Sequence, residues 1–324
     1  MNNFKKIGLT ALAASLVSVS AHAGALTASG SASMNTEGHS GTGLDAPTTF
    51  SMANSVTMAG SGELDNGLTV SVSFEMDQGT GNNSSLGFDN HSVTISSDDM
   101  GSLTLAGHGG SSATSKIDTT AAGDMWDSFD GTEYVGGATV AAGASGNGGT
   151  DNSFFYSSPD VMDGLNFTLS YNPQNATNSG EMGVGINYTG LEGLSVSYAK
   201  SDEETYAANT TGDNTVIKAS YAYGPVTVSY SEMDHDEGLA ANDLITESYA
   251  ISYTISDELS VTYGTETADK GGSSTDLEIE GFKASYTTGG MTISASMMSL
   301  ENGNFGTASE QDMDYWSLGA SFAF

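Results

Sequence analysis

The sequence predicts an all-β protein: a 16-stranded antiparallel transmembrane β-barrel with a long third loop folded into the lumen. Three observations carry this prediction. Apolar and polar residues alternate in segments of strand length, short turns recur about every 31 residues, and the chain ends on Phe-Ala-Phe. Alternation gives a strand one apolar and one polar face. In a membrane barrel the apolar face meets lipid and the polar face lines the lumen.

The C-terminal segment Met313–Phe324 shows this alternation clearly. Counting back by twos gives one apolar face, made of Phe324, Phe322, Ala320, Leu318 and Trp316. Small, mostly polar residues occupy the other face. Chain ends tend to fray and expose their side chains, so a bare aromatic ending is unusual in a soluble protein. We therefore predict that Met313–Phe324 is the closing strand of the barrel.

The first 23 residues have the pattern of a secretory signal peptide. Lys5 and Lys6 precede an apolar run, and a small-x-small cleavage site ends at Ala23. The apolar run is shorter than the roughly 20 residues that a membrane-spanning helix needs. We expect residues 1–23 to be cleaved and residues 24–324 to form a single barrel domain, with its first strand near Gly24–Asn35.

Composition excludes several classes of function. The formal net charge is −33, with 40 acidic residues, no arginine and no cysteine. A nucleic-acid partner would require a basic surface, and thiol chemistry is impossible without cysteine. The histidines after the signal peptide show neither metal-ligand spacing nor a serine-nucleophile motif. We therefore predict no enzymatic activity and no cofactor.

The turns predict the strand number. A short phrase, a turn followed by alternation with Ser or Thr, starts at Gly67, Gly101, Gly164, Gly193, Gly224, Glu258 and Gly290. Gly, Asn and Asp in these joints are the residues that tight turns demand. The joints at the opposite ends are longer and polar, the rim asymmetry of bacterial membrane barrels. Seven hairpins, with one strand at each end of the chain, make sixteen strands, enough to enclose water.

The whole of residues 24–324 resembles the general-diffusion porins of Gram-negative bacteria, most closely the alphaproteobacterial, Rhodobacter-type porins. The resemblance is one of pattern: signal peptide, alternating strands, short turns, one very long loop and the closing Phe324. It implies an outer-membrane channel for ions and small hydrophilic solutes, and a homotrimer in contact with lipid and lipopolysaccharide. It also implies that the barrel-assembly machinery recognises Phe324.

The long third loop, from Gly107 to about Thr150, is the candidate constriction. A loop of this length in a compact domain is usually functional or disordered. The segment from Asp124 to Asp130 predicts a helical turn with three acids on one face, while Trp126 and Phe129 pack it to the wall. The candidate constriction residues are Lys116, Asp118, Asp124, Asp127, Asp130 and Glu133.

The wall is expected to contribute three further charges to the lumen, because Glu75, Lys218 and Lys283 fall on the polar phase of their strands. Relatives commonly set loop acids against a cluster of wall arginines, and this chain has none. A predominantly negative bore is therefore expected, which attracts cations and repels anions.

Two other interpretations of the long loop stay open: a solvated external loop, or an extra hairpin at Thr132–Ala142 that would bring the barrel to eighteen strands. The alternative function is a secreted calcium-binding adhesin, prompted by acidic, glycine-containing loops such as the one at Asp234–Gly238. Calcium-binding β-solenoids repeat every nine residues, which this chain does not do, although Ca²⁺ at its acidic loops is compatible with the sequence.

Overall fold

The structure is a computed structural model that describes residues 26–41, 48–77, 88–129, 133–134, 138–139, 151–173, 178–205, 210–236, 238, 240–306 and 312–324. The predicted signal peptide lies outside the described residues, so its cleavage stays a prediction.

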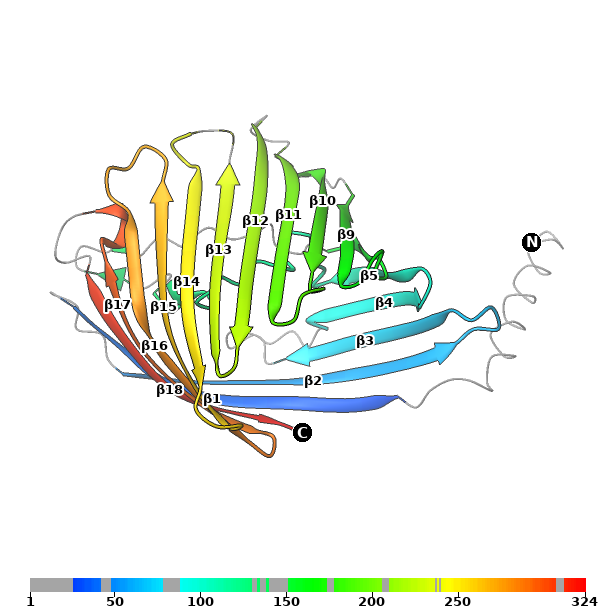
Figure 1. Ribbon diagram of the computed structural model, residues 1–324, viewed down its shortest axis with the longest axis horizontal. Coiled ribbons are helices and arrows are strands. Elements are labelled where there is room, and N and C mark those ends of the chain that lie inside the picture. The colour runs from blue at the N-terminus through cyan, green and yellow to red at the C-terminus, as the bar shows by residue number, and fades with distance from the viewer. Residues whose placement is uncertain are drawn as a thin grey trace, which may run out of the picture.

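Sixteen strands of the described chain close into one antiparallel barrel (Figure 1). They are β1 (Thr27–Gly41), β2 (Thr49–Glu63), β3 (Thr69–Asp77), β4 (Asn90–Ser97), β5 (Gly101–His108), β8 (Ser153–Ser157), β9 (Leu165–Asn172), β10 (Asn178–Tyr188), β11 (Leu194–Thr205), β12 (Thr210–Tyr223), β13 (Val226–Asp236), β14 (Leu244–Thr254), β15 (Leu259–Lys270), β16 (Leu277–Thr288), β17 (Met291–Glu301) and β18 (Met313–Ala323).

Each strand pairs with its neighbours in the chain, and β1 closes the sheet against β18. That seam runs over eleven residue pairs, from Ser31 opposite Ala323 to Gly41 opposite Met313. The sixteen strands and the closing role of the last one are therefore confirmed. The first strand ends six residues beyond the predicted Asn35, because its pairing with β18 continues as far as Gly41 opposite Met313, although the apolar alternation has already stopped.

The seven short turns lie where the repeat predicted them. Six of the phrase-starting glycines have positive φ, the left-handed region that glycine enters without steric cost: Gly67, Gly101, Gly164, Gly193, Gly224 and Gly290. The hairpin predicted as an alternative at Thr132–Ala142 is present as β6 (Glu133–Tyr134) and β7 (Ala138–Thr139). It forms a separate two-stranded sheet and adds no strand to the barrel.

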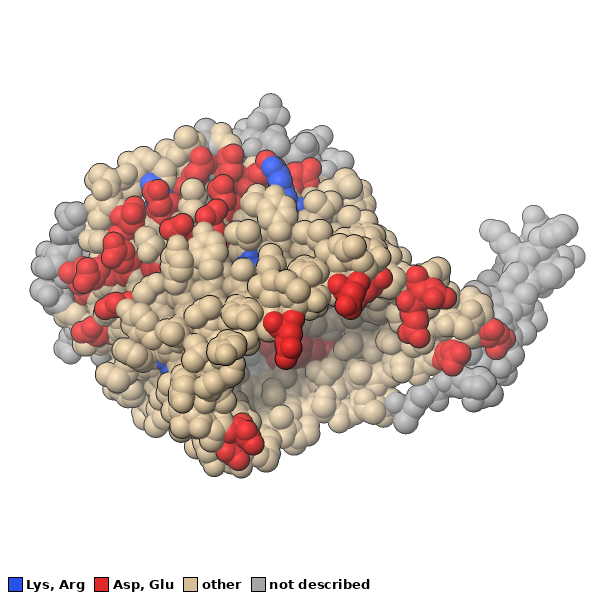
Figure 2. All heavy atoms as spheres, in the orientation of Figure 1, with Lys and Arg blue, Asp and Glu red and all other residues tan. Residues whose placement is uncertain are grey.

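The two faces of the wall differ as the alternation predicts. Large apolar side chains stand exposed on the outward phase, for example Phe167 and Leu169 on β9. The side chains between them, such as Thr168 and Ser170, are buried on the inward phase. Acidic residues on the outside gather over the upper ends of β11–β17, above a largely uncharged surface (Figure 2).

Candidate functional site

Residues 109–129, the first part of the loop between β5 and β8, lie against the inward phase of the wall. Hydrogen bonds from this segment reach serine side chains on four strands, β9, β11, β13 and β14. The pairs are Ala113 N to Ser170 Oγ (3.0 Å), Thr114 Oγ1 with Ser201 Oγ (3.0 Å), Ala121 N to Ser231 Oγ (2.8 Å) and Ala122 N to Ser248 Oγ (2.9 Å). These four serines are buried. Serine hydroxyls thus satisfy backbone and side-chain groups of a segment that has no sheet partner of its own.

Two wall lysines hold the same segment by its carbonyl groups. Lys218 on β12 donates to the carbonyl oxygens of Thr119 (2.5 Å) and Thr120 (3.2 Å). Lys283 on β16 donates to the carbonyl oxygens of Ala122 (2.9 Å) and Gly123 (2.7 Å). Hydrogen bonds from charged donors are stronger than neutral ones. The two lysines predicted to line the lumen are therefore directed at the loop backbone.

A buried carboxylate on β15 completes the attachment. Glu266 is 2% exposed and accepts hydrogen bonds from the Thr120 hydroxyl and, at 3.0 Å, from the Trp126 backbone N–H. Asp124 accepts from the Thr120 backbone N–H at 2.8 Å, and its own N–H donates to the Thr120 hydroxyl at 2.7 Å. The Thr120 side chain thus connects the wall carboxylate to the turn that begins at Asp124.

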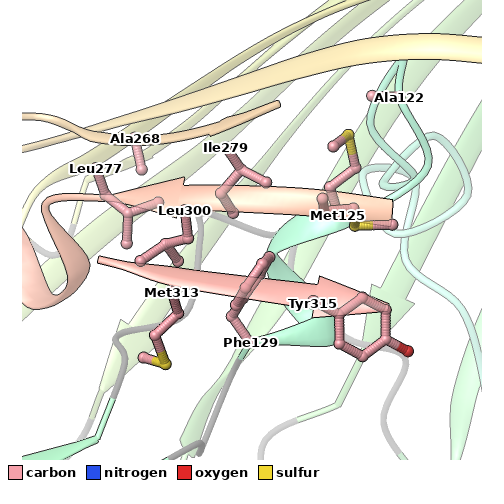
Figure 3. Packing of buried hydrophobic residues seen from close by; sticks show 10 residues of the cluster. Ala122, Met125, Phe129, Ala268, Leu277, Ile279, Leu300, Met313 and Tyr315 are labelled. Atoms are coloured by element: carbon pink, nitrogen blue, oxygen red, sulfur yellow. The ribbon is translucent and has the colours of Figure 1, made fainter. Parts of the chain in front are cut away.

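That turn is a short 3₁₀ helix, η1 (Met125–Ser128), which confirms the predicted helical turn. Its apolar side chains are buried against β15–β18: Met125 is 1% exposed and Phe129 is fully buried. Figure 3 shows both pointing at the strands, among Ile279, Leu300 and Tyr315. Trp126 packs against the same cluster and is partly buried. Burial of a side chain of this size contributes roughly 1.5–3 kcal/mol, so the apolar contacts support the polar ones.

The end of the segment also touches the first strand. His39 Nε2 of β1 lies 2.8 Å from the carbonyl oxygen of Ser128. Because a carbonyl oxygen only accepts, this hydrogen bond requires the proton to be on Nε2. The His39 ring also contacts Phe129 and Tyr315, with centroids 6.0 and 5.0 Å away. The segment therefore touches the wall at both sides of the β1–β18 seam.

The predicted constriction residues have different environments. Lys116 is exposed, with its Nζ 5.5 Å from the centre of the Phe155 ring, and Asp118 is partly buried. Asp124 is partly buried, whereas Asp127 is exposed.

Burial raises the pKa of the Asp124 carboxyl above its usual value, and the Thr120 N–H and the charges of Lys218 and Lys283 offset this only in part. Asp130 and the side chain of Glu133 lie outside the described residues, as does most of 130–150. Narrowing of the lumen by the whole loop therefore stays a prediction.

On the wall, Glu75 accepts a hydrogen bond from Asn90 Nδ2 at 2.8 Å, next to the end of β3. Elsewhere the inward phase of β2–β4 is rich in hydroxyl groups. A hollow of 320 Å³ there is lined mainly by serine and threonine side chains, among them Ser71, Ser73 and Thr94. This part of the wall is suited to contact with water and hydrophilic solutes.

Glu266, His39 and the four serines are the parts of the site that sequence reasoning missed. Glu266 does carry a signal, because it falls on the same phase of β15 as Thr262 and Gly264 rather than with the outward Tyr263. A lone carboxylate among small residues on that inward face indicates that another part of the chain must supply hydrogen-bond donors to it. The serines carry no such signal, since inward serines occur on most strands.

Among the described residues, no group of three or more His, Cys, Asp or Glu side chains could hold a metal ion. The long loops fall partly outside those residues, so Ca²⁺ at the acidic loops stays a prediction.

No helix in the described part of the chain has the length and hydropathy to cross a membrane.

A closed sixteen-stranded barrel with an apolar outer face, a polar inner face and a loop segment attached inside defines a barrel channel. Residues 8–324 match the Gram-negative porin family, and the chain belongs to that family. It is thus a porin of the bacterial outer membrane, a class of diffusion channel and not of enzymes. No curated protein sequence matches the chain closely enough to count as a relative.

Solved porin structures share the fold. The anion-selective porin from Comamonas acidovorans has a TM-score of 0.68 at 16% identity, over 93% of this chain and 99% of that one. A triple mutant of the Rhodopseudomonas blastica porin has a TM-score of 0.63 at 18% identity, over 93% of this chain and 100% of that one. Another mutant of the same porin gives 0.63 at 19% identity, with the same two coverages. At such identities the similarity establishes the fold and leaves ion preference open.

Proposed function

We propose that this porin is a homotrimeric channel that passes small hydrophilic solutes and ions and prefers cations to anions. The observation that carries the cation preference is the use of the two wall lysines. Lys218 and Lys283 direct their ammonium groups at carbonyl oxygens of the loop segment. The carbonyl oxygens partly compensate the positive charge of these lysines, which would otherwise attract an anion in the bore. The exposed Asp127 and partly buried Asp118 and Asp124 remain near the bore.

Magnitudes support a modest preference. At physiological salt the Debye length is about 8 Å, so fixed charges in a narrow bore are incompletely screened. Each pairwise interaction in a watery environment is about 1 kcal/mol at contact distance, and several like charges add. The Comamonas neighbour is described as anion-selective, so the proposed cation preference has to come from the charges of this chain and not from the shared fold.

The experiment is a reversal-potential measurement in a planar bilayer with a KCl gradient. The unmodified porin should give the potential of a cation-preferring channel. The triple variant Asp124→Asn, Asp127→Asn, Asp130→Asn should shift it toward anions. Three outward acids provide the matched control, Glu232→Gln, Glu247→Gln and Asp269→Asn, which removes the same charge from the outer face. An unchanged potential in the first triple variant, or equal shifts in both, would remove the loop as the selectivity element.

Two grounds support the proposed trimer: membership of the porin family and one exposed apolar surface. The outward phase of β1 and β2 carries large apolar side chains more exposed than most, with Met34 57%, Met52 64% and Phe50 83% exposed. Met34 pairs directly with Met52 across the two strands. We place the contact between copies here. Met34→Glu with Met52→Glu should dissociate the trimer on native gels, while the same change at Ile251 and Val228, outward on β14 and β13, should leave it intact.

A further inference from the structure

A carboxylate on the first strand, Glu37, lies on the inward face of the wall and is held there by uncharged donors. Its Oε2 accepts hydrogen bonds from Asn35 Nδ2 at 2.9 Å and from the Tyr315 hydroxyl at 3.0 Å. Its Oε1 accepts a longer one, 3.4 Å, from the Thr49 hydroxyl. The donors come from three neighbouring strands, β1, β18 and β2, so together they restrict the orientation of the carboxylate. Since all three are neutral, they leave its negative charge uncompensated.

Glu37 lies next to the last described contacts between the loop segment and the wall. His39, two residues further toward the long loops, binds the Ser128 carbonyl, and the Tyr315 ring packs beside Phe129 with centroids 5.8 Å apart. Figure 3 shows Tyr315 next to Phe129, with its hydroxyl at the edge of the apolar cluster. Two residues along a strand correspond to about 7 Å. The Glu37 carboxylate therefore lies at the edge of the covered part of the wall, on the side of the short turns.

Cross-strand register puts Glu37 and Lys283 on one transverse row of the wall. Glu37 pairs with Ser317 on β18, Ser317 pairs with Ser296 on β17, and Ser296 pairs with Lys283 on β16. Neighbouring strands lie about 4.8 Å apart, so three steps separate the two charges by about 14 Å along the wall. This exceeds the Debye length of about 8 Å at physiological salt, and the Lys283 ammonium already donates to two loop carbonyls. Lys283 therefore does not neutralise Glu37.

We propose that Glu37 is the wall residue that a hydrated cation contacts as it passes the loop segment, and that it determines ion preference together with the loop acids. No ion pair in the described part of the chain includes Glu37. An oriented, unpaired carboxylate attracts cations and repels anions in a bore where screening is incomplete. This inference rests on the proposed passage of ions through the barrel and adds a second determinant of their sign.

The sequence contains no cysteine, which allows the charge at this position to be set chemically. Glu37→Cys provides a single thiol, and methanethiosulfonate reagents convert it to a side chain that ends in either a negative sulfonate or a positive trimethylammonium group. Reversal potentials in a KCl gradient are measured before and after each reagent. Glu37→Gln removes the charge and keeps the shape of the side chain.

Glu37→Gln should lower the cation-to-anion permeability ratio about two- to fivefold, the size expected for one incompletely screened charge. In Glu37→Cys the sulfonate reagent should restore the ratio of the unmodified porin, and the trimethylammonium reagent should lower the ratio further. Glu247→Cys is the matched control, because Glu247 is exposed on the outward face of β14, between the buried Thr246 and Ser248. Neither reagent should change the ratio of this variant.

Three results would overturn the proposal. A thiol at position 37 that does not react would place this side chain outside the ion path. Shifts in the same direction with both reagents would show that bulk and not charge changes the ratio. An unchanged ratio in Glu37→Gln, with a heat-modifiable band that establishes folding, would show that passing ions do not sense this carboxylate.

These results are distinguishable from a failure of the proposed function. An unmodified porin that prefers anions would contradict the proposed cation preference, whereas opposite shifts with the two reagents would still place Glu37 in the ion path. Conversely, the triple variant of the loop acids can shift the reversal potential while Glu37→Gln does not. In that case the loop acids determine the preference and the inference about Glu37 is wrong.

Discussion

Gly30 and Phe324 close the barrel against each other. The Gly30 N–H donates to the Phe324 carbonyl at 2.7 Å, and the Phe324 N–H donates to the Gly30 carbonyl at 3.0 Å. The Phe324 ring lies over the glycine, because a Cβ there would come within 2.5 Å of ring carbon Cε2. Trp316 covers Gly38 in the same way. Glycines on the outward phase of β1 therefore make room for the aromatic rings of β18.

The Gly30–Phe324 contact predicts that Gly30→Leu destabilises the seam. The leucine must displace the Phe324 ring, and overpacking of this kind costs about 1–3 kcal/mol. The temperature at which the barrel loses its heat-modifiable migration on gels should fall. Gly30→Leu combined with Phe324→Ala should recover most of the loss, because the smaller C-terminal side chain vacates the space. A double variant no more stable than Gly30→Leu alone would contradict the ring-over-glycine explanation.

Deletion of Phe324 is predicted to impair folding even without cellular factors. The deletion removes two backbone hydrogen bonds to Gly30 together with the ring, whereas Phe324→Ala removes only the ring. Refolding of both variants into pure lipid vesicles separates the two contributions. The deletion should fold less completely than Phe324→Ala there. If both fold normally in vesicles and fail only in cells, Phe324 acts as a signal to the assembly machinery and its seam contacts contribute little.

Lys283→Met is predicted to loosen the loop segment and to increase cation preference. The substitution removes the ammonium group that donates to the carbonyl oxygens of Ala122 (2.9 Å) and Gly123 (2.7 Å). Hydrogen bonds to charged groups contribute about 1.5–3 kcal/mol each. Open-channel current noise should rise, and the reversal potential should move further toward that of a cation channel.

Lys200→Met is the matched control for Lys283→Met. Lys200 lies on the outward phase in an exposed ion pair with Asp213 at 2.6 Å, so this variant removes the same charge without touching the segment. Its noise and reversal potential should stay at the unmodified values. Indistinguishable behaviour of the two lysine variants would show that Lys283 does not hold the loop.

The strand pattern was predictable from the sequence because alternation and turn chemistry are local. Glycine at positions such as Gly67 and Gly193 predicts a turn by residue type alone, and each turn fixes the register of the hairpin beside it. The contacts that attach the loop to the wall were harder to predict from the sequence. Trp126 and Phe129 could be recognised as wall contacts because they are apolar in a polar loop.

The polar contacts of the loop could not be predicted from the sequence. Glu266 meets Thr120 across 146 residues of sequence, and nothing in either local pattern selects the other. The lysines show the same limit. The strand phase of Lys218 correctly placed it inside the barrel, but phase alone cannot tell an ammonium that faces water from one that binds a carbonyl.

The pKa of Asp124 predicts how cation preference depends on pH. Burial holds this pKa above its ordinary value of 3.8. The carboxyl therefore takes up a proton at a higher pH than an exposed aspartate does, as the solution is acidified. Protonation removes a negative charge from the loop, so cation preference should begin to fall at that higher pH. Since the pKa is also higher in the folded than in the unfolded protein, protonation of Asp124 stabilises the fold as the pH falls through it. The segment should accordingly stay attached while its charge is lost.

Reversal potentials measured in a KCl gradient over a series of falling pH values test this order of events. The unmodified porin should show an early loss of cation preference, followed by a further loss as other carboxyls protonate. Asp124→Asn should start from a weaker cation preference at neutral pH and lack the early step. Asp127→Asn, at the exposed acid of the same segment, should also start weaker but keep the early step. If the early step persists in Asp124→Asn, or disappears in Asp127→Asn instead, the titrating carboxyl is not Asp124. Unchanged current noise across the early step would confirm that the segment stays attached to Glu266 and the wall.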